Sequence, residues 1–163
     1  VKVTTKNNSI IVTVDLDRPL PKEWYGKAGF NFELFPPSLF GKSWIFDGKS
    51  GIFPRQANGP VQKDQTGEVQ PVAYGKGKKL IIAAETDEQK MIIESFTGDL
   101  QLLDGRNKHN NGWFVVRSLI PDGAVKEAIK WIITPNTIPD WKYKPVVQVS
   151  QIGYHPKQQK LPL

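Results

Sequence analysis

The stretch SIIVTVDLD, residues 9–17, decides the fold class because its apolar residues recur at every second position. Ile10, Val12, Val14 and Leu16 share one face of an extended chain, and the residues between them share the other. This alternation is typical of a half-buried β-strand. The segments GFNFELF, residues 29–35, and SWIFD, residues 43–47, alternate in the same way. The dominant period of the chain is therefore two.

Further short segments rich in β-branched residues continue this pattern: KLIIAA (79–84), QKMIIESF (89–96), DLQLLD (99–104), WFVVRSLI (113–120), EAIKWIITP (127–135) and KPVVQVSQI (144–152). Turn signals such as TGD, DGRNKHNNG and PDG separate them. The 13 prolines and 14 glycines argue against long helices. These features predict an all-β fold, a loop-rich antiparallel β-sandwich of the jelly-roll or immunoglobulin-like type, with a helix content below about 10%.

The pattern divides the chain into three parts. Residues 1–134 form the predicted sandwich, which at this length buries enough surface for a core without disulfides. Residues 135–145, PNTIPDWKYKP, are rich in proline and polar residues and are predicted to be a linker. Residues 146–163 hold one more predicted strand and end abruptly, as the start of a further, truncated module would.

Composition excludes several classes of function. The chain has no cysteine, which rules out disulfides, thiolate metal sites and a cysteine nucleophile. Its 22 basic and 16 acidic residues give a net charge of +6, but the lysines are spread among acids. A nucleic-acid site usually has a clustered basic stripe, so no nucleic-acid partner is predicted. No run approaches the ~18 apolar residues of a membrane span, and none is predicted.

The sequence predicts no metal ion or other cofactor. The two histidines, His109 and His155, lie in separate segments and give no zinc pattern. Oxygen ligands for a structural calcium are present in FDGKSG (46–51) and LLDGRN (102–107). Neither loop has the dense alternation of acids of an EF-hand, which leaves calcium as the less favoured alternative.

The aromatic residues suggest a sugar-binding surface. Exposed tryptophan and tyrosine rings stack on the C–H groups of sugars. Trp24 and Tyr25 are adjacent in a loop and cannot both point into one core, so one of them is expected to be exposed. Between residues 31 and 60 phenylalanines outnumber tryptophans by five to one, so most of these rings are expected inside. Trp44 is the best stacking candidate of that stretch.

A polar group accompanies the rings. Arg55, Gln56 and Asn58 follow one another in FPRQANG and carry groups that hydrogen-bond sugar hydroxyls. Buried phenylalanines are expected to pin this loop and hold the three side chains rigidly at the surface, with Trp24 or Tyr25 near enough to complete a sugar-sized site. The alternative is that Arg55 braces the loop by pairing with Glu33 or Asp47. A second polar loop, residues 106–111, is interpreted as a long hairpin tip.

Part of the chain resembles a known family. VSQIGYHPKQQK, residues 149–160, is similar to the opening strand and turn of the immunoglobulin-like module that precedes the catalytic barrel in glycoside hydrolase family 9, the cellulase family. Residues 30–60 together with LLDGRNKHNNGWFVVRSLIP, residues 102–121, resemble an additional N-terminal β-domain of some of these enzymes. The resemblance implies a non-catalytic accessory module of an extracellular or cell-surface enzyme. Its implied partners are the adjacent domains of the same polypeptide and a polysaccharide such as a β-glucan.

No catalytic residue follows from this resemblance. The chemistry of the family belongs to a large helical barrel, which 163 residues with a β pattern cannot contain. A self-contained glycosidase would need two carboxyls about 5–5.5 Å or 6.5–9.5 Å apart, and any chain with 16 acids offers candidates, here Glu33, Asp47, Glu94 and Asp104.

Two functions stay open. One is a carbohydrate-binding module in which Trp24, Tyr25, Trp44, Arg55, Gln56 and Asn58 contact the polysaccharide. The other is a structural domain that packs on the neighbouring modules without binding sugar.

Overall fold

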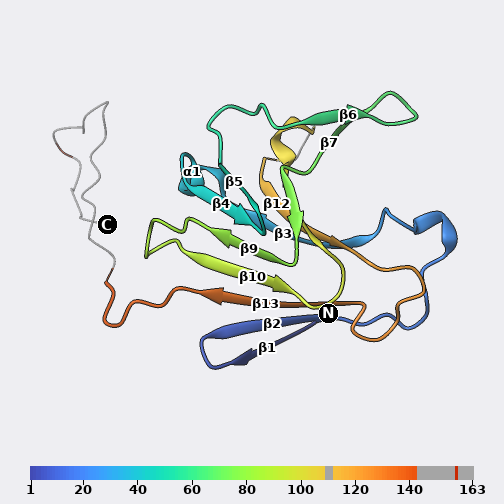
Figure 1. The fold of residues 1–163 in the computed structure, drawn as a ribbon, viewed down its shortest axis with the longest axis horizontal. Helices are drawn as coiled ribbons and strands as arrows, with labels where there is room; N and C mark the ends of the chain where they lie inside the picture. The colour runs from blue at the N-terminus through green and yellow to red at the C-terminus, as the bar shows by residue number, and fades with distance from the viewer. Residues whose placement is uncertain (109–111, 143–156, 158–163) are drawn as a thin grey trace.

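The computed structural model describes residues 1–108, 112–142 and 157 of the chain. Two antiparallel sheets form a β-sandwich (Figure 1), which confirms the predicted fold class. One sheet has the strand order β1 (Lys2–Lys6), β2 (Ser9–Val14), β13 (Ile129–Pro135), β10 (Met91–Ser95), β9 (Lys79–Ile82), β4 (Ser43–Phe46) and β5 (Lys49–Ile52). The other has the order β3 (Gly29–Leu34), β12 (Phe114–Leu119), β11 (Leu100–Asp104) and β8 (Gly75–Gly77).

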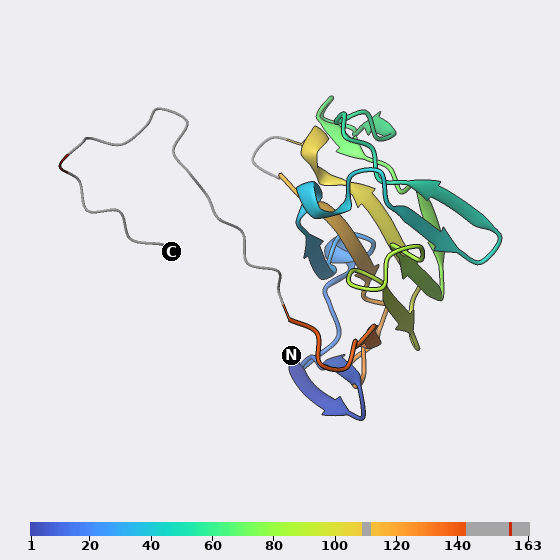
Figure 2. The same ribbon diagram turned by 90° about the vertical axis from the view of Figure 1, so that its left-hand side faces the viewer.

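The remaining elements are short. β6 (Val61–Lys63) and β7 (Val69–Pro71) pair as a separate hairpin, which lies at the top in both views of the ribbon (Figures 1 and 2). Within the described residues, helix is limited to α1 (Pro36–Leu39) and the two 3-10 turns η1 (Lys22–Trp24) and η2 (Gly105–Asn107). The low helix content is as predicted.

The core lies between the two sheets because alternate residues of each strand point inward. In the larger sheet Val12, Ile93 and Trp131 are buried, and in the smaller sheet Leu102 and Phe114 face them. Their neighbours on each strand point to the outer faces. For these strands the period-two pattern identified both the strand and its buried side.

Two glycines let large rings of β4 enter this core. A Cβ atom on Gly75 would lie 2.7 Å from a ring carbon of Phe46, and one on Gly51 would lie 2.4 Å from the indole of Trp44. Such distances are shorter than van der Waals contact allows. Only glycine fits at these positions, and the rings of Phe46 and Trp44 occupy the space that it leaves.

The period-two pattern missed the edges of the larger sheet. Every residue of β1 is exposed, and β5 is also mostly exposed, so neither strand has a buried side that alternation would reveal. β1 joins β2 through a turn in which Asn7 has a φ of 53°, a conformation that asparagine tolerates well. Lys2 and Lys6 on this edge disfavour pairing with another chain.

Within the described residues the last strand is β13, which ends at Pro135, the first residue of the predicted linker. Beyond it the backbone N–H of Asn136 donates to Lys90 O at 2.9 Å, which keeps the chain on the sandwich at this point. The predicted strand 144–152 and most of 146–163 lie outside the described residues. The linker and the following module stay predictions.

Asp64 caps the turn between β6 and β7. Its carboxylate accepts hydrogen bonds from the Thr66 hydroxyl at 2.6 Å, from the backbone N–H groups of Thr66 and Glu68 at 2.9 and 3.0 Å, and from Gln70 Nε2 at 2.7 Å. These bonds, led by that from the Thr66 side chain, lower the pKa of Asp64 from 3.8 to about 2. The cap therefore requires the ionised carboxylate.

We expect this turn to lose its order only in strong acid. Because the folded pKa is depressed, the contribution of Asp64 to stability is present above pH 3.8 and is lost as the pH falls through about 2. Amide chemical shifts of Thr66 and Glu68 should titrate with a midpoint near 2, and Asp64→Asn should abolish that titration. A midpoint at the ordinary aspartate value would show that the cap is not formed in solution.

Candidate functional site

Arg106 in η2 holds the loop of residues 53–60. Its Nη1 donates to the backbone oxygen of Arg55 at 3.0 Å, and its Nη2 to those of Pro54 and Gln56 at 2.9 and 3.0 Å. Beside it, Asn107 Nδ2 donates to Gly59 O at 3.1 Å. Arg106 and Asn107, at the start of the second polar loop, therefore brace the first loop. The rest of the predicted hairpin tip, residues 109–111, lies outside the described residues.

Asp104 fixes the position of Arg106. Its carboxylate is completely buried and accepts from Arg106 Nε and Nη2, each at 2.8 Å, and from the Tyr74 hydroxyl at 3.1 Å. The hydrogen bond to Asp104 raises the pKa of Arg106, and burial, followed by the charge of Asp104, raises the pKa of Tyr74. The guanidinium also lies 4.4 Å from the centroid of the Phe114 ring. A buried network satisfied in this way is rigid.

This brace presents Arg55, Gln56 and Asn58 as exposed side chains on a fixed backbone, as predicted. The guanidinium of Arg55 lies over the half-buried ring of Phe40, 5.3 Å from its centroid. In the part of the chain that the structure describes, Arg55 forms no ion pair with Glu33 or Asp47. The bracing alternative was thus right about the loop and wrong about which arginine holds it.

Trp44 does not present a stacking surface, and its prediction as a sugar-stacking residue is corrected. Its side chain is only 4% exposed. The ring stacks on Tyr74 with 5.9 Å between ring centroids and packs against Phe46 and Gly51. As an inward residue of β4 it belongs to the core.

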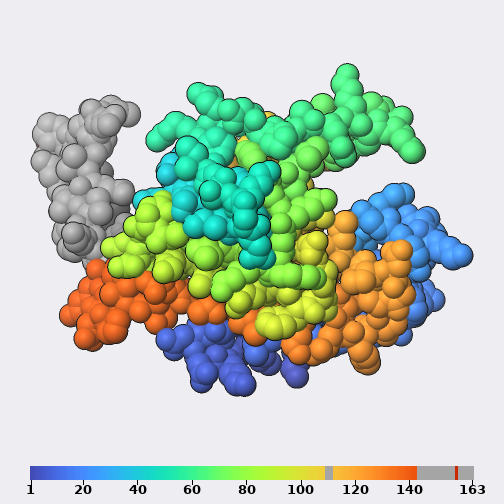
Figure 3. Space-filling view, in the orientation of Figure 1, coloured from blue at the N-terminus to red at the C-terminus, as the bar shows by residue number. Residues whose placement is uncertain are grey.

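Trp24 and Tyr25 lie away from the polar loop. Trp24 is 54% exposed and Tyr25 is half-buried, so one ring of the pair is exposed as expected. The pair precedes the first residue of β3, however, whereas the polar loop lies beyond the last, and six residues of strand span about 20 Å. Figure 3 shows the blue segment around Trp24 at one end of the molecule and the teal segment that leads to the polar loop toward the other. The expectation that they complete one site is wrong.

The outer face of the four-stranded sheet carries a polar row that the sequence analysis missed. Lys76, Gln101, Arg117 and Asn31 are cross-strand neighbours in register on β8, β11, β12 and β3. Arg117 Nε donates to Asn31 Oδ1 at 2.9 Å. Residues two apart on a strand share a face. Of those next to the row on this face, Glu33 is exposed, whereas Val115 and Leu103 are buried.

Two exposed aromatic rings lie at one end of that face. Phe35 is in phase with Asn31, and Trp113 is in phase with Arg117, each just beyond its strand. Their ring centroids are 5.6 Å apart, and the side chains are 58% and 38% exposed. Most phenylalanines of residues 31–60 are buried or half-buried, as expected, and Phe35 is the exposed one. The alternation of NFELF, read through to its last residue, would have placed it on the outer face.

The polar loop lies at the same end of the sandwich as this pair. Gly105 N, in the turn that carries Arg106, donates to Trp113 O at 2.9 Å. Arg106 contacts the ring of Phe114, the neighbour of Trp113. The sheet face and the polar loop therefore meet at the start of β12.

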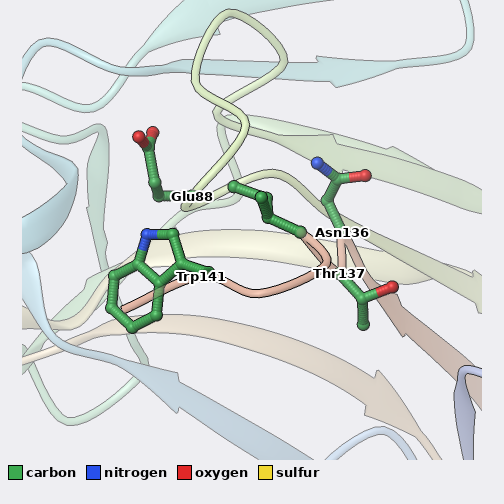
Figure 4. A pocket seen from close by; sticks show the side chains of 5 residues that line it. Glu88, Asn136, Thr137 and Trp141 are labelled. Atoms are coloured by element: carbon green, nitrogen blue, oxygen red, sulfur yellow. The ribbon is translucent and has the colours of Figure 1, made fainter. Parts of the chain in front are cut away.

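A separate open pocket of about 330 Å³ lies beyond the end of β13. Glu88, Asn136, Thr137, Ile138 and Trp141 line it. Figure 4 shows Trp141 and Glu88 on one side and Asn136 and Thr137 on the other. The side-chain amide of Asn136 donates a hydrogen bond to Asp87 O at 3.0 Å, which fixes the position of this residue. This pocket combines one ring, 53% exposed, with polar side chains.

Three of the four candidate acids, Glu33, Glu94 and Asp104, lie on different faces or are already paired. Glu33 and Glu94 point to opposite outer faces of the sandwich, and both oxygens of Asp104 accept from Arg106, which leaves the LLDGRN loop without a free carboxylate for calcium. Within residues 1–108, 112–142 and 157, no three His, Cys, Asp or Glu side chains gather around a common point. No helix in the same residues is long and apolar enough to cross a membrane.

Comparison with known proteins gives no match to this chain, whether with protein-family models, with curated proteins or with solved structures.

Proposed function

We propose that the chain is a non-catalytic module that binds a polysaccharide on the outer face of its four-stranded sheet, as an accessory to a secreted polysaccharide-degrading enzyme of the family 9 type. The observation that carries the proposal is the exposed Phe35–Trp113 pair on the same face as the row Lys76–Gln101–Arg117–Asn31. Aromatic faces attract the C–H surface of a sugar ring, and the polar row supplies partners for its hydroxyls.

Rigidity supports this use of the face. The row is built on four hydrogen-bonded strands. Side chains on strands are positioned with less variation than side chains on loops. A weakly binding site benefits from this rigidity, because little conformational entropy is lost when the ligand binds. Arg55, Gln56 and Asn58 extend the site at the Trp113 end, since Arg106 fixes the backbone that carries them.

We expect Trp113→Ala to weaken polysaccharide binding roughly 10-fold or more, because a stacked ring contributes about 1–3 kcal/mol. The control is Trp24→Ala, which removes a more exposed tryptophan, 54% against 38%, from the other end of the sandwich and should leave the affinity unchanged. Affinity electrophoresis in gels that contain soluble polysaccharides, followed by calorimetry, measures both. Equal losses in the two variants, or a loss confined to Trp24→Ala, would move the site away from this face.

The second candidate function is a structural domain that packs on a neighbouring module. The pocket beside Trp141 favours it, because an exposed ring next to Ile138 offers apolar contact just after the last strand of the sandwich. In this case no polysaccharide should retard the domain in the gel. Trp141→Ala in a longer protein that includes the following module should then separate one cooperative melting transition into two.

A further inference from the structure

We infer that the polysaccharide bound on this face is acidic, with carboxylate groups that pair with Arg117. The inference rests on the proposed function and adds the chemical class of the ligand. The four arginines of the chain all lie in the described residues and differ in their partners.

Arg117 is the only one of these arginines that is both half-buried and without an acid. Its single hydrogen bond goes to Asn31, a neutral amide, and within the described part of the chain it forms no ion pair. Arg106, which is also largely buried, is neutralised by Asp104. Arg18 and Arg55 are exposed.

A partly desolvated cation without a counter-ion is unfavourable. Desolvation also lowers the pKa of Arg117. A guanidinium has five N–H donors, and Arg117 uses only its Nε, so its terminal nitrogens remain available to a ligand. A carboxylate is the group that fits them best, because its two oxygens match the planar fork in a bidentate, charge-assisted pair.

The charges around Arg117 favour an anion. Lys76, at the β8 end of the same row, is exposed and forms no ion pair among the described residues. Glu33 is exposed on the same face, opposite Val115 and one diagonal step from Arg117, but the two do not pair. Asp99, which precedes β11, pairs with Lys78 at 3.4 Å. Among the residues that the structure describes, the face therefore has two unpaired cations, Lys76 and Arg117, and one unpaired acid, Glu33, on a protein of net charge +6.

The spacing requires an extended ligand. Trp113, the residue before β12, and Arg117 in β12 are four residues apart in extended chain, which corresponds to about 13 Å. A single sugar cannot stack on the ring pair and reach the guanidinium at once, whereas a chain of sugars can. A single-stranded nucleic acid also combines rings with negative charge, so it is included in the test.

The test compares the same polymers with and without their charge. Soluble polyuronates, namely polygalacturonate, alginate and glucuronoxylan, are titrated into the protein beside their carboxyl-reduced forms, a neutral β-glucan and a single-stranded oligonucleotide. We expect at least one polyuronate to bind about tenfold or more tightly than its reduced form. In Arg117→Gln that ratio should fall close to one, and Arg117→Lys, which keeps the charge without the fork, should restore it only in part.

Arg18→Gln is the matched control, because it removes the same charge from an exposed site and should leave the ratio unchanged. If Arg117→Gln does not fold, Lys76→Gln at the exposed end of the row replaces it, with a smaller decrease in the ratio. Equal binding of charged and reduced polymers would overturn this inference and leave polysaccharide binding intact. Absence of binding to every polysaccharide, or preference for the oligonucleotide, would overturn both proposals.

Discussion

Arg106→Ala is expected to lower the free energy of unfolding by about 3–5 kcal/mol and the melting temperature by roughly 10 °C or more. The substitution leaves the fully buried carboxylate of Asp104 without its counter-ion, with only the Tyr74 hydroxyl and the backbone N–H of residue 106 as partners. It also releases the backbone oxygens of residues 54–56. Thermal and urea unfolding followed by circular dichroism measure the loss.

Two controls separate the brace from a general effect of charge. Arg106→Lys keeps the charge but cannot contact the carboxylate and three carbonyl oxygens at once, so it should recover only part of the stability. Arg55→Ala removes an exposed arginine from the loop that the brace holds and should change the melting temperature by no more than a few degrees. A large loss in Arg55→Ala would mean that the two arginines exchange roles in solution.

Trp44→Ala is expected to cost about 3–5 kcal/mol of stability, because it empties a ring-sized volume between Gly51, Tyr74 and Phe46 that the backbone cannot close. Trp44→Phe should cost much less. The indole Nε1 is buried, and none of the described residues accepts a hydrogen bond from it, so its removal relieves an unsatisfied donor.

Trp113→Ala should have the opposite effect to Trp44→Ala. The ring of Trp113 is partly exposed, so its loss should change stability little and weaken polysaccharide binding strongly. If Trp44→Ala melts close to the wild type and instead weakens polysaccharide binding, the assignment of Trp44 to the core is wrong. Melting curves and affinity electrophoresis on the three variants decide between these outcomes.

The sequence predicted the sandwich because burial on one side of a strand makes apolar residues recur at every second position. The strands with a buried side, such as β2, β4 and β12, were found this way. β1 was missed because a fully exposed edge strand leaves no such period. Polar residues on the outer face of a sheet show no pattern either, since the alignment of Arg117 with Asn31 depends on strand pairing between segments far apart in the sequence.

The candidate site was predicted only in part for the same reason. The exposed group Arg55, Gln56 and Asn58 is local, and local composition indicated it correctly. Which arginine braces that loop depends on the approach of two loops about fifty residues apart, where Arg106 reaches the backbone of residues 54–56. Trp24 was assigned to the wrong end because a sequence does not show the direction in which β3 runs relative to the polar loop.

The brace on residues 54–56 acts through backbone oxygens, which every amino acid possesses. The shape of the loop is therefore independent of the side chains at positions 55, 56 and 58, and those side chains are free to vary. A library randomised at these three positions, with Arg106 and Asp104 kept, should yield mostly folded proteins that differ in what they recognise. In evolutionary terms, such a loop allows ligand preference to drift without loss of the fold.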